Sequence, residues 1–503
     1  HVVVLSFLCI YDVNKCILVA EDEKKTYICT RKREESMVLP QEFTTYTRAL
    51  MGNELYEKLH AALDQEPPVS LRLNPFKTIN GETEVCNVDE GVAWSDNGYY
   101  LSGRPNFTFD PLFHAGAYYV QEASSMFVAW IVKQLIHSPI TMLDLCAAPG
   151  GKSTALRSVL PQGSLLFCNE PITQRASILA ENVQKFGHPD MVVTSNFASD
   201  YRKSGLQFDA ILADVPCSGE GMFRKDAGAI AEWSETNVEH CWRLQREIIA
   251  DIWPCLKPGG LLIYSTCTFN DKENERNVEW IAQELGAIHD LPPIPSEWNI
   301  TRSIGFDLPA CRFIPGVSKG EGLFLCVLRK SLEDDIAHEE KRKRPQKSMA
   351  QKNKFPETPQ WLNDNFAFET RQINGNIHAI PSQWADLFDK ASTALRIVHA
   401  GVEQATPKGK DLVPHPALAY SIALNTNAFN KCELDYESAI AFLRREAITL
   451  TPETPRGYVL VTYQGMPLGF VKNIGNRANN LYPQEWRIKS THIPQPQQII
   501  KLR

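Results

Sequence analysis

The segment Leu143-Asp144-Leu145-Cys146-Ala147-Ala148-Pro149-Gly150-Gly151-Lys152-Ser153-Thr154 has the pattern of a strand, a tight loop and the start of a helix. Its adjacent glycines allow a sharp turn and a close approach of the backbone to a ligand. The helix expected from Lys152 points its free N–H groups at the same space. The segment matches neither GxGxxG nor GxxxxGK(S/T), which disfavours a dinucleotide site and a P-loop. We therefore expect this loop to hold the amino-acid end of a nucleoside-like cofactor.

The next two strand ends carry polar side chains. Glu170 follows the second expected strand, and Asn196 follows the third. A carboxylate at the second strand end accepts hydrogen bonds from ribose hydroxyls, and an amide after the third suits an adenine edge. Loop, acid and amide in this order fit S-adenosylmethionine.

From residue 114 to residue 330 strand and helix patterns alternate. Apolar runs bounded by turn residues indicate strands at 141–145, 164–169, 191–195, 209–213, 260–265 and 323–328. Helical patterns separate most of them. The alternation predicts an α/β fold with a doubly wound, Rossmann-like sheet and helices on both faces.

Two cysteines follow strands of this expected sheet. Cys267 comes just after strand 260–265, in Tyr264-Ser265-Thr266-Cys267, and Cys217 follows strand 209–213, in Asp214-Val215-Pro216-Cys217. Neighbouring strands lie roughly 4.8 Å apart, so both thiols and Asp214 would share one crevice if these strands are neighbours. The alternative is that each cysteine is a small buried hydrophobic residue.

Composition restricts the class of protein. The 503 residues have a net charge of −7 and 43% apolar residues, which is ordinary for a globular protein and argues against a uniform coating of nucleic acid. The 13 cysteines contain no CxxC pair, so we expect a reducing compartment, a cytoplasmic location and no metal site. No apolar run is long enough for a membrane span.

The remaining chain divides by pattern. Residues 1–36 are expected to carry little of the function. Residues 37–113 are expected to form a small α+β domain with a helix over 40–66 and strands at 69–75, 92–94 and 99–101. Residues 331–360 form a basic linker, with seven basic residues and no acid between 341 and 354. This linker is either only solvated or in contact with a polyanion.

Residues 361–503 are expected to form a C-terminal α+β region with a small β barrel. From 455 to 503 there are seven basic residues and one acidic residue, interleaved with aromatic side chains. Basic charge with stacking surfaces suits RNA, whereas rings in the core of a β domain are the alternative. We expect deletion of 361–503 to weaken RNA binding and to leave cofactor affinity nearly unchanged.

Three motifs resemble the NOL/NOP/Sun group of RNA cytosine-5 methyltransferases. They are Asp144-Leu145-Cys146-Ala147-Ala148-Pro149-Gly150-Gly151-Lys152, Asp214-Val215-Pro216-Cys217-Ser218-Gly219 and Ser265-Thr266-Cys267-Thr268. The tail from Pro467 to Arg487 resembles the RNA-binding, PUA-like tail of the bacterial F-type 16S rRNA methyltransferases. Two positions depart from the family pattern: Asn196 stands where an acid is common, and Leu323 where Phe is common.

The resemblance implies roles for individual residues. Cys267 matches the nucleophile, Cys217 the thiol that assists product release, and Asp214 the acid beside the base. The expected cofactor contacts are Cys146, Ala147, Ala148, Pro149, Gly150, Gly151, Lys152, Glu170, Arg175, Asn196 and Asp214.

The resemblance implies an S-adenosylmethionine-dependent enzyme that methylates C5 of a cytosine in 16S rRNA or the small ribosomal subunit, through a covalent Cys–C6 adduct. We expect a monomer with no membrane partner and N-terminal RNA contacts at 37–113. The alternatives are the same chemistry on tRNA, and a non-catalytic RNA-binding factor for ribosome assembly.

Overall fold

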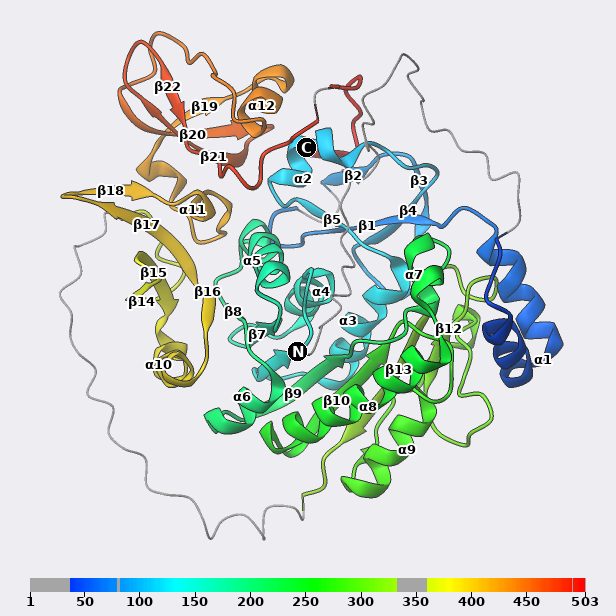
Figure 1. Ribbon diagram of the computed structural model, residues 1–503. Coiled ribbons are helices and arrows are strands. Elements are labelled where there is room, and N and C mark those ends of the chain that lie inside the picture. Colours follow the sequence, from blue (N-terminus) through cyan, green and yellow to red (C-terminus); the bar gives the residue numbers. More distant parts are fainter. Residues whose placement is uncertain (1–36, 79–81, 333–359, 491, 503) are drawn as a thin grey trace.

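The computed structural model describes residues 37–78, 82–332, 360–490 and 492–502 (Figure 1). Residues 1–36 and the basic cluster 341–354 therefore lie outside the described residues. The described chain forms a large central sheet, a small N-terminal sheet and two C-terminal four-stranded sheets.

The N-terminal part pairs one helix with a small antiparallel sheet. The helix expected over 40–66 is α1 (Gln41–Leu63), which is interrupted at Gly52, where φ is 75°. The sheet has the order β3-β4-β1-β5. Its strands are β1 (Val69–Leu73), β3 (Val88–Gly91), β4 (Gly98–Leu101) and β5 (Tyr118–Val120). The short helix α2 (Pro111–His114) precedes β5.

The strand expected at 92–94 is wrong. Val92 and Trp94 lie in a turn, and both side chains are buried. The Trp94 indole Nε1 donates to the carbonyl of Ala123 at 2.7 Å. Two apolar residues separated by one position therefore anchor a loop onto the helix that follows, rather than forming one face of a strand.

The central sheet confirms the predicted doubly wound fold. Its order is β11-β13-β10-β9-β6-β7-β8-β16, with β12 paired to β13. Strands β6 to β10 run parallel, and β13 is antiparallel to β10. The strands from the predicted α/β region are β6 (Thr141–Asp144), β7 (Leu165–Asn169), β8 (Met191–Thr194), β9 (Phe208–Asp214), β10 (Leu256–Thr266), β11 (Ile288–His289), β12 (Cys311–Phe313) and β13 (Leu323–Arg329).

The strand order reverses between β6 and β9. The chain runs outward from β6 to β8 and then returns to place β9 on the other side of β6. In open α/β sheets, ligands bind outside the carboxyl ends of the strands at such a reversal. The loops after β6, β7, β9 and β10 therefore meet at one edge.

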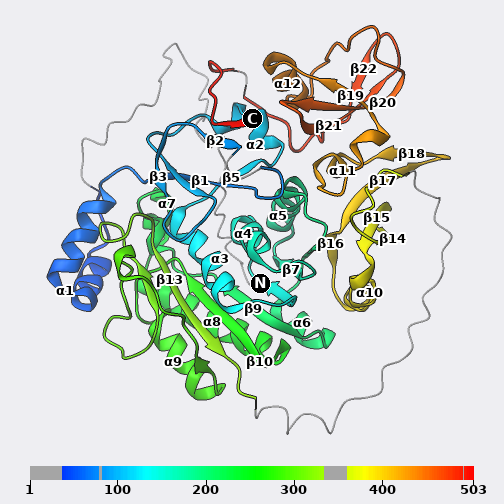
Figure 2. The same cartoon turned by 180° about the vertical axis from the view of Figure 1, so that it is seen from behind.

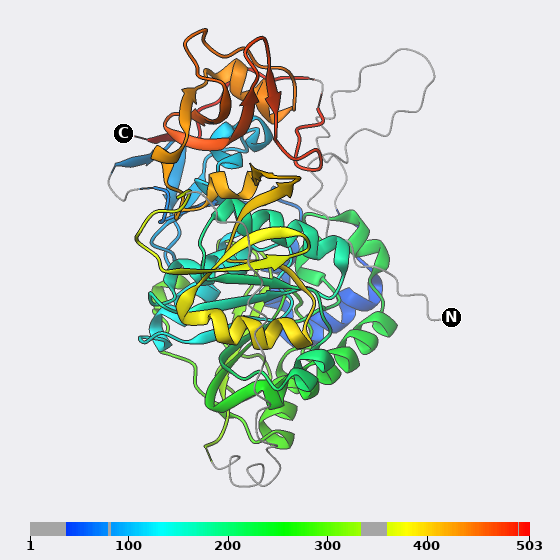
Figure 3. The same cartoon turned by 90° about the vertical axis from the view of Figure 1, so that its left-hand side faces the viewer.

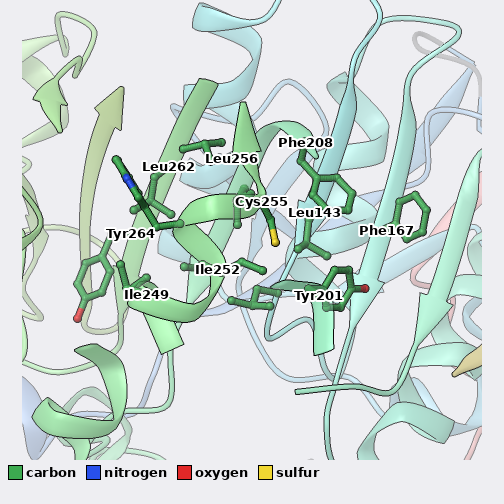
Figure 4. Close-up of a cluster of buried hydrophobic side chains, with 14 of the residues drawn as sticks. Leu143, Phe167, Tyr201, Phe208, Ile249, Ile252, Cys255, Leu256, Leu262 and Tyr264 are labelled. Atoms are coloured by element: carbon green, nitrogen blue, oxygen red, sulfur yellow. The ribbon is translucent and has the colours of Figure 1, made fainter. Parts of the chain in front are cut away.

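Helices cover both faces of this sheet, because side chains alternate between the faces along each strand. Met142 and Leu143 belong to opposite core clusters. One face carries α3 (Ala123–Leu135), α4 (Gly151–Val159) and α5 (Thr173–Phe186). The other carries α6 (Ala198–Ser204), α8 (Glu235–Ile252), α9 (Glu275–Glu284) and α10 (Ala385–Ala394), whose core is shown in part in Figure 4. The short helix α7 (Ala227–Glu232) follows the β9 loop.

The C-terminal region joins the central sheet, which the sequence analysis did not predict. Strand β16 (Ile397–Ala400) pairs antiparallel with β8 and extends the sheet (Figure 2). Helix α10 packs Phe388 and Ala391 into the same core as Leu143 and Phe167. Figure 3 shows this yellow region lying across the edge of the sheet. The expectation that deletion of 361–503 leaves cofactor affinity nearly unchanged stays a prediction, and these contacts oppose it because the deletion would remove part of the sheet and its core.

The rest of the C-terminal region forms two further sheets. One contains β14 (Phe368–Ile373), β15 (Asn376–Pro381), β17 (Val402–Lys408) and β18 (Asp411–Pro414). The other contains β19 (Asn430–Glu433), β20 (Gly457–Tyr463), β21 (Met466–Asn473) and β22 (Ala478–Asn480). Two helices accompany them, α11 (Pro416–Tyr420) and α12 (Tyr436–Leu443).

The last sheet packs back on the N-terminal part. Phe442 and Tyr482 share a core with Leu71 and Phe107. The chain ends in β23 (Ile500–Leu502), which pairs with β2 (Thr83–Val85). The C-terminal end of the described chain is therefore held against the small N-terminal domain.

The shared core predicts how the protein unfolds. Phe388→Ala removes a side chain that is 3% exposed, and a buried Phe→Ala change costs roughly 3–5 kcal/mol. We expect calorimetry to show a lower unfolding temperature for the transition that includes the cofactor domain. Phe366→Ala, at a half-buried ring in a different cluster, is the matched control with a smaller shift. An unchanged cofactor-domain transition in Phe388→Ala would show that α10 folds separately.

Candidate active site

The structure brings the two predicted thiols into contact. Cys217 Sγ and Cys267 Sγ are 3.2 Å apart. They follow β9 and β10, which are parallel neighbours with Ser265 opposite Asp214. Both cysteines are half-buried, and all ten cysteines in the described part of the chain are free of disulfides. The two thiols and Asp214 thus lie together at neighbouring strand ends, as the sequence predicted.

Buried apolar side chains fix the two strands from below. Leu262 and Tyr264 of β10 and Ile211 and Ala213 of β9 lie in one core cluster, together with residues of α8. Figure 4 shows Leu262 and Tyr264 beside Ile249 and Ile252 of α8. A one-residue slip of either strand would turn these side chains to the opposite face, so the register that pairs the thiols is strongly specified.

Two buried glutamates connect the loops that carry the thiols. Glu220, in the Cys217 loop, accepts hydrogen bonds from the backbone N–H groups of Phe269 and Asn270 at 2.7 and 3.0 Å. Glu273, in the Cys267 loop, accepts from the backbone N–H of Ser218 at 3.1 Å. Each loop thus supplies a carboxylate that holds the backbone of the other.

The same loops approach each other too closely for a side chain at Gly221. The Gly221 N–H donates to the Cys267 carbonyl at 2.8 Å. A Cβ at Gly221 would lie 2.6 Å from that carbonyl oxygen, which is nearer than Cβ atoms come to a backbone atom. Glycine at this position therefore permits the contact that positions Cys267.

The environment distinguishes the two thiols. The hydrogen bond to Cys267, together with burial, raises the pKa of Cys217 well above its ordinary value. Either sulfur can donate in this contact. The Cys267 backbone N–H in turn points at Cys217 Sγ, at 3.4 Å. Cys217 Sγ thus accepts a backbone hydrogen bond that ties it to the Cys267 loop.

Asp214 is held between two partners. Lys152 Nζ lies 2.9 Å from Oδ2, and Ser265 Oγ donates to Oδ1 at 2.7 Å. Burial alone would lower the pKa of Lys152, but the charge and hydrogen bond of Asp214 raise it above its ordinary value. A permanent ammonium group therefore lies at the crevice, between the predicted cofactor loop and the thiols.

The cofactor loop adopts the predicted form. It follows β6 and ends at Gly150, whose φ of 116° is in the left-handed region, before α4 begins at Gly151. A Cβ at Gly151 would lie 3.2 Å from the ring of Tyr119. Below the loop, the Oδ1 of Asp144 is buried without a hydrogen-bond partner, and burial raises the pKa of Asp144 to about 7. The loop therefore combines a backbone turn without side chains at its two glycines with a nearby carboxylate oxygen, Asp144 Oδ1, that has no hydrogen-bond partner.

Glu170 and Arg175 lie beside this loop. Arg175 Nη1 is 3.4 Å from Glu170 Oε2, and its Nη2 donates to the Ala148 carbonyl at 3.2 Å. Burial raises the pKa of Glu170, although the charge of Arg175 opposes that shift. A carboxylate at the end of β7, beside the glycine turn, fits the ribose of S-adenosylmethionine. The residues present therefore fit the predicted cofactor.

Asn196 has a different environment from the one expected. Its Oδ1 accepts from the Arg396 backbone N–H at 3.0 Å, and its Nδ2 donates to the Arg396 carbonyl at 3.2 Å. The segment before β16 thus uses one donor and one acceptor of this amide. The role of Asn196 as the adenine contact stays a prediction. Its amide has fewer free donors and acceptors for the base than expected, because the Arg396 backbone uses one of each.

Two apolar residues of this edge were missed from the sequence. Ile172 is 37% exposed and Phe197 is 67% exposed. Each follows a predicted polar contact, Glu170 or Asn196. Exposed apolar side chains on both sides of a polar strand end suit the two faces of a nucleobase. The sequence feature that could have identified Ile172 and Phe197 is their position just after the ends of β7 and β8.

Comparisons with known proteins decide the family. Models for the 16S rRNA methyltransferase RsmB/F, the N-terminal domain of 16S rRNA methyltransferase RsmF and the methyltransferase RsmF PUA domain match residues 136–329, 39–123 and 429–488. Ribosomal RNA small subunit methyltransferase F of Shewanella loihica is 32% identical, over 83% of this chain and 88% of that protein. The chain belongs to the RsmF family of methyltransferases. This confirms the predicted family and its S-adenosylmethionine-dependent chemistry.

Other comparisons agree with RsmF membership. The protein of the same name from Escherichia coli O6:H1 is 28% identical, over 90% of this chain and 97% of that protein. The crystal structure of PH0851 matches with a TM-score of 0.51 and 24% identity, over 58% of this chain and 66% of that one, which supports the fold alone. Among the described residues of this RsmF-family chain, no helix has the length and apolarity to cross a membrane.

The contact between the thiols predicts a change in reactivity. Cys267→Ala removes the partner whose hydrogen bond raises the pKa of Cys217 most. We therefore expect the pH midpoint for alkylation of Cys217 by iodoacetamide to fall, as measured by mass spectrometry of the labelled peptide. Cys432, on β19, serves as the internal reference.

Cys267→Val is the matched control, because valine restores volume without an acceptor. It should give the same low midpoint as alanine. If valine restored the high midpoint of the native protein, burial rather than the hydrogen bond would control Cys217.

Proposed function

We propose that this protein methylates C5 of a cytosine in 16S rRNA, with Cys267 as the nucleophile and Cys217 as the group that resolves the adduct. The observation that carries the proposal is the 3.2 Å contact between the two thiols that follow β9 and β10. The RsmF family relationship supports the rRNA substrate. S-adenosylmethionine supplies an electrophilic methyl carbon when bound.

Cytosine C5 is a poor nucleophile, so the first step activates the ring. Cys267 Sγ forms a bond to C6, and N3 takes up a proton from water, which leaves C5 electron-rich. The Cys217 thiol stabilises the attacking thiolate through its hydrogen bond. The Lys152 ammonium group adds a favourable charge interaction with Cys267. The chain thereby lowers the cost of forming the thiolate at neutral pH.

Asp214 is proposed to contact the protonated N3. Ser265 and Lys152 each occupy one of its oxygens, which fixes the plane of the carboxylate while leaving a lone pair for the base. After C5 has attacked the methyl carbon, the C5 proton must leave and the C6–Sγ bond must break. The N3 proton then returns to water.

Cys217 is suited to take the C5 proton only after the adduct exists. In the free protein, the bond to Cys267 is the largest cause of its raised pKa. Once Cys267 Sγ is bonded to C6, it is a thioether and a weak acceptor. Cys217 can then release its own proton to water and accept the C5 proton as Cys267 leaves. The contact between the two thiols thus explains why Cys267 acts first, as nucleophile, and Cys217 acts second, as base.

A cysteine exchange experiment tests the proposal. Cys267→Ala should abolish methyl transfer and form no covalent complex. Cys217→Ala should form the adduct without resolving it, so that rRNA stays attached to the protein on a denaturing gel. The double variant should lose the attached band, because the adduct requires Cys267.

Two outcomes contradict this assignment. Attachment in Cys267→Ala with none in Cys217→Ala would reverse the roles. Loss of stability in both variants with no attachment in either would mean that the cysteines only pack. Cys255→Ala, at a buried cysteine in the core away from the crevice, is the control for packing alone.

The C-terminal sheet β19 to β22 is proposed to bind rRNA backbone. The basic residues Arg456, Arg477, Arg487 and Lys489 are exposed, and Lys472 lies over the Tyr458 ring at 5.1 Å. The match to the RsmF PUA domain covers this sheet. The predicted domain bounds 37–113, 114–330, 331–360 and 361–503 remain proposals. We also propose that the enzyme is a cytoplasmic monomer, since one chain supplies the thiols, the cofactor loop and the basic surface.

Charge removal tests this surface. Each phosphate contact contributes about 0.7–0.9 to the slope of log affinity against log salt. Arg477→Ala with Arg487→Ala should therefore weaken rRNA binding and flatten this slope, as measured by filter binding over a salt series. Lys133→Ala is the control, because it lies near the end of α3, which leads to the opposite edge of the sheet. An equal loss in the control would mean that net charge alone matters.

A further inference from the structure

A group of metal-ligand side chains lies outside the active site, where the C-terminal region meets the central sheet. His378 of β15, His399 of β16 and Glu403 of β17 are 1%, 4% and 8% exposed. One potential ligand atom from each lies within 4.8 Å of the others. Three buried groups of this kind, from three different strands, converge on one point.

The distances in the group are longer than hydrogen bonds. His378 Nε2 is 3.5 Å from Glu403 Oε1, and His399 Nδ1 is 3.6 Å from Oε2. Charge-assisted N–H···O bonds are about 2.7–2.9 Å long. Ligand atoms about 2.0–2.2 Å from a tetrahedral Zn²⁺ are about 3.3–3.6 Å from one another. The observed separations fit ligands around an ion better than hydrogen-bonded partners.

The hydrogen bonds of the two imidazoles also fit ligands around an ion. His378 Nδ1 lies 2.9 Å from the Ala400 carbonyl, which can only accept, so the ring proton is on Nδ1 and the lone pair is on Nε2. His399 Nδ1 faces the Gln184 Nε2 donor at 3.2 Å, so it also carries a lone pair. Two nitrogen lone pairs and a carboxylate thus face each other, which a cation between them would stabilise.

Neighbouring side chains hold the carboxylate in place. Asn376 Nδ2 donates to Glu403 Oε1 at 2.6 Å, and Gln184 Nε2 donates to Oε2 at 3.0 Å. Oriented carboxylates and carbonyl-bonded imidazoles are the usual outer support of metal ligands.

His415 belongs to the surroundings rather than to the ligand set. Its Nδ1 accepts from the Ala417 backbone N–H at 3.2 Å, so its proton is on Nε2. This Nε2 faces Glu403 Oε1 at 3.5 Å. His415 is therefore a donor toward the carboxylate, and it provides a matched control among the histidines of the cluster.

We propose that His378, His399 and Glu403 bind a structural Zn²⁺ ion at the junction of β15, β16 and β17 with helix α5. Imidazole with carboxylate favours Zn²⁺ over Ca²⁺ and Mg²⁺, which take oxygen ligands. The spacing of these three ligands along the chain does not match that of a zinc ribbon. No metal site was therefore predicted from the sequence. The ion holds β16 in the central sheet, next to the segment that bonds Asn196.

Metal analysis of the purified full-length protein tests the proposal. After exposure to ZnCl₂ and removal of free ion, the native protein and His415→Gln should retain about one zinc per chain, whereas His378→Gln and His399→Gln should retain almost none. Glutamine keeps much of the side-chain volume without an imidazole ligand. Co²⁺ in place of Zn²⁺ should give the visible absorption of a tetrahedral site in the first two proteins only.

A chelator experiment keeps the test valid if the variants fail to fold. Treatment of the native protein with EDTA should lower its unfolding temperature by several degrees, and ZnCl₂ should restore it. Methyl transfer is not needed for either readout, so failure here is distinct from failure of the proposed activity. A native protein that binds neither ion and does not respond to ZnCl₂ would show a hydrogen-bonded polar cluster and overturn the proposal.

Discussion

The chemistry of this protein depends on two carboxylates that cross between neighbouring loops. Glu220 and Glu273 each belong to one cysteine loop and bond the backbone of the other. Burying a carboxylate is costly unless its oxygens are hydrogen-bonded, and here backbone N–H groups and the Gln245 and Asn270 amides provide those bonds. The distance between the thiols is therefore set by backbone contacts, and it persists when one thiol changes its chemical state.

The same arrangement makes the local charge balance unusual. The carboxylates of Asp214, Glu220 and Glu273 lie at the two cysteine loops and concentrate negative charge there. Two features offset this: Lys152 neutralises Asp214, and burial, with the nearby charge of Glu220, raises the pKa of Glu273 to about 7. The crevice therefore holds less net negative charge than its composition suggests. The proposed nucleophile Cys267 therefore lies in a site whose carboxylates are partly neutralised.

The sequence predicted those features that are encoded locally. Strand and loop patterns located β6 to β10, and parallel strands bring their carboxyl ends to one edge, so Cys217, Cys267 and Glu170 could be placed together. Long-range contacts had no local pattern. Glu220 and Glu273 looked like ordinary charged residues, Trp94 filled a core from a turn, and β16 gave no signal that it would pair with a strand two hundred residues earlier. Residues whose role depends on a partner remote in sequence were the ones missed.

The position of β16 relates RNA binding to the cofactor. Without it, β8 would be the edge of the central sheet, with unpaired backbone groups exposed to solvent. The segment that enters β16 uses the Arg396 backbone to hold Asn196, and the Arg396 side chain donates to Thr173 at the start of α5. The strands that follow lead to the basic C-terminal sheet, which itself packs on the N-terminal part. A displacement of that sheet on rRNA would therefore act on the carboxyl ends of β7 and β8. The last domain of the chain is thus part of the structure that shapes the cofactor site.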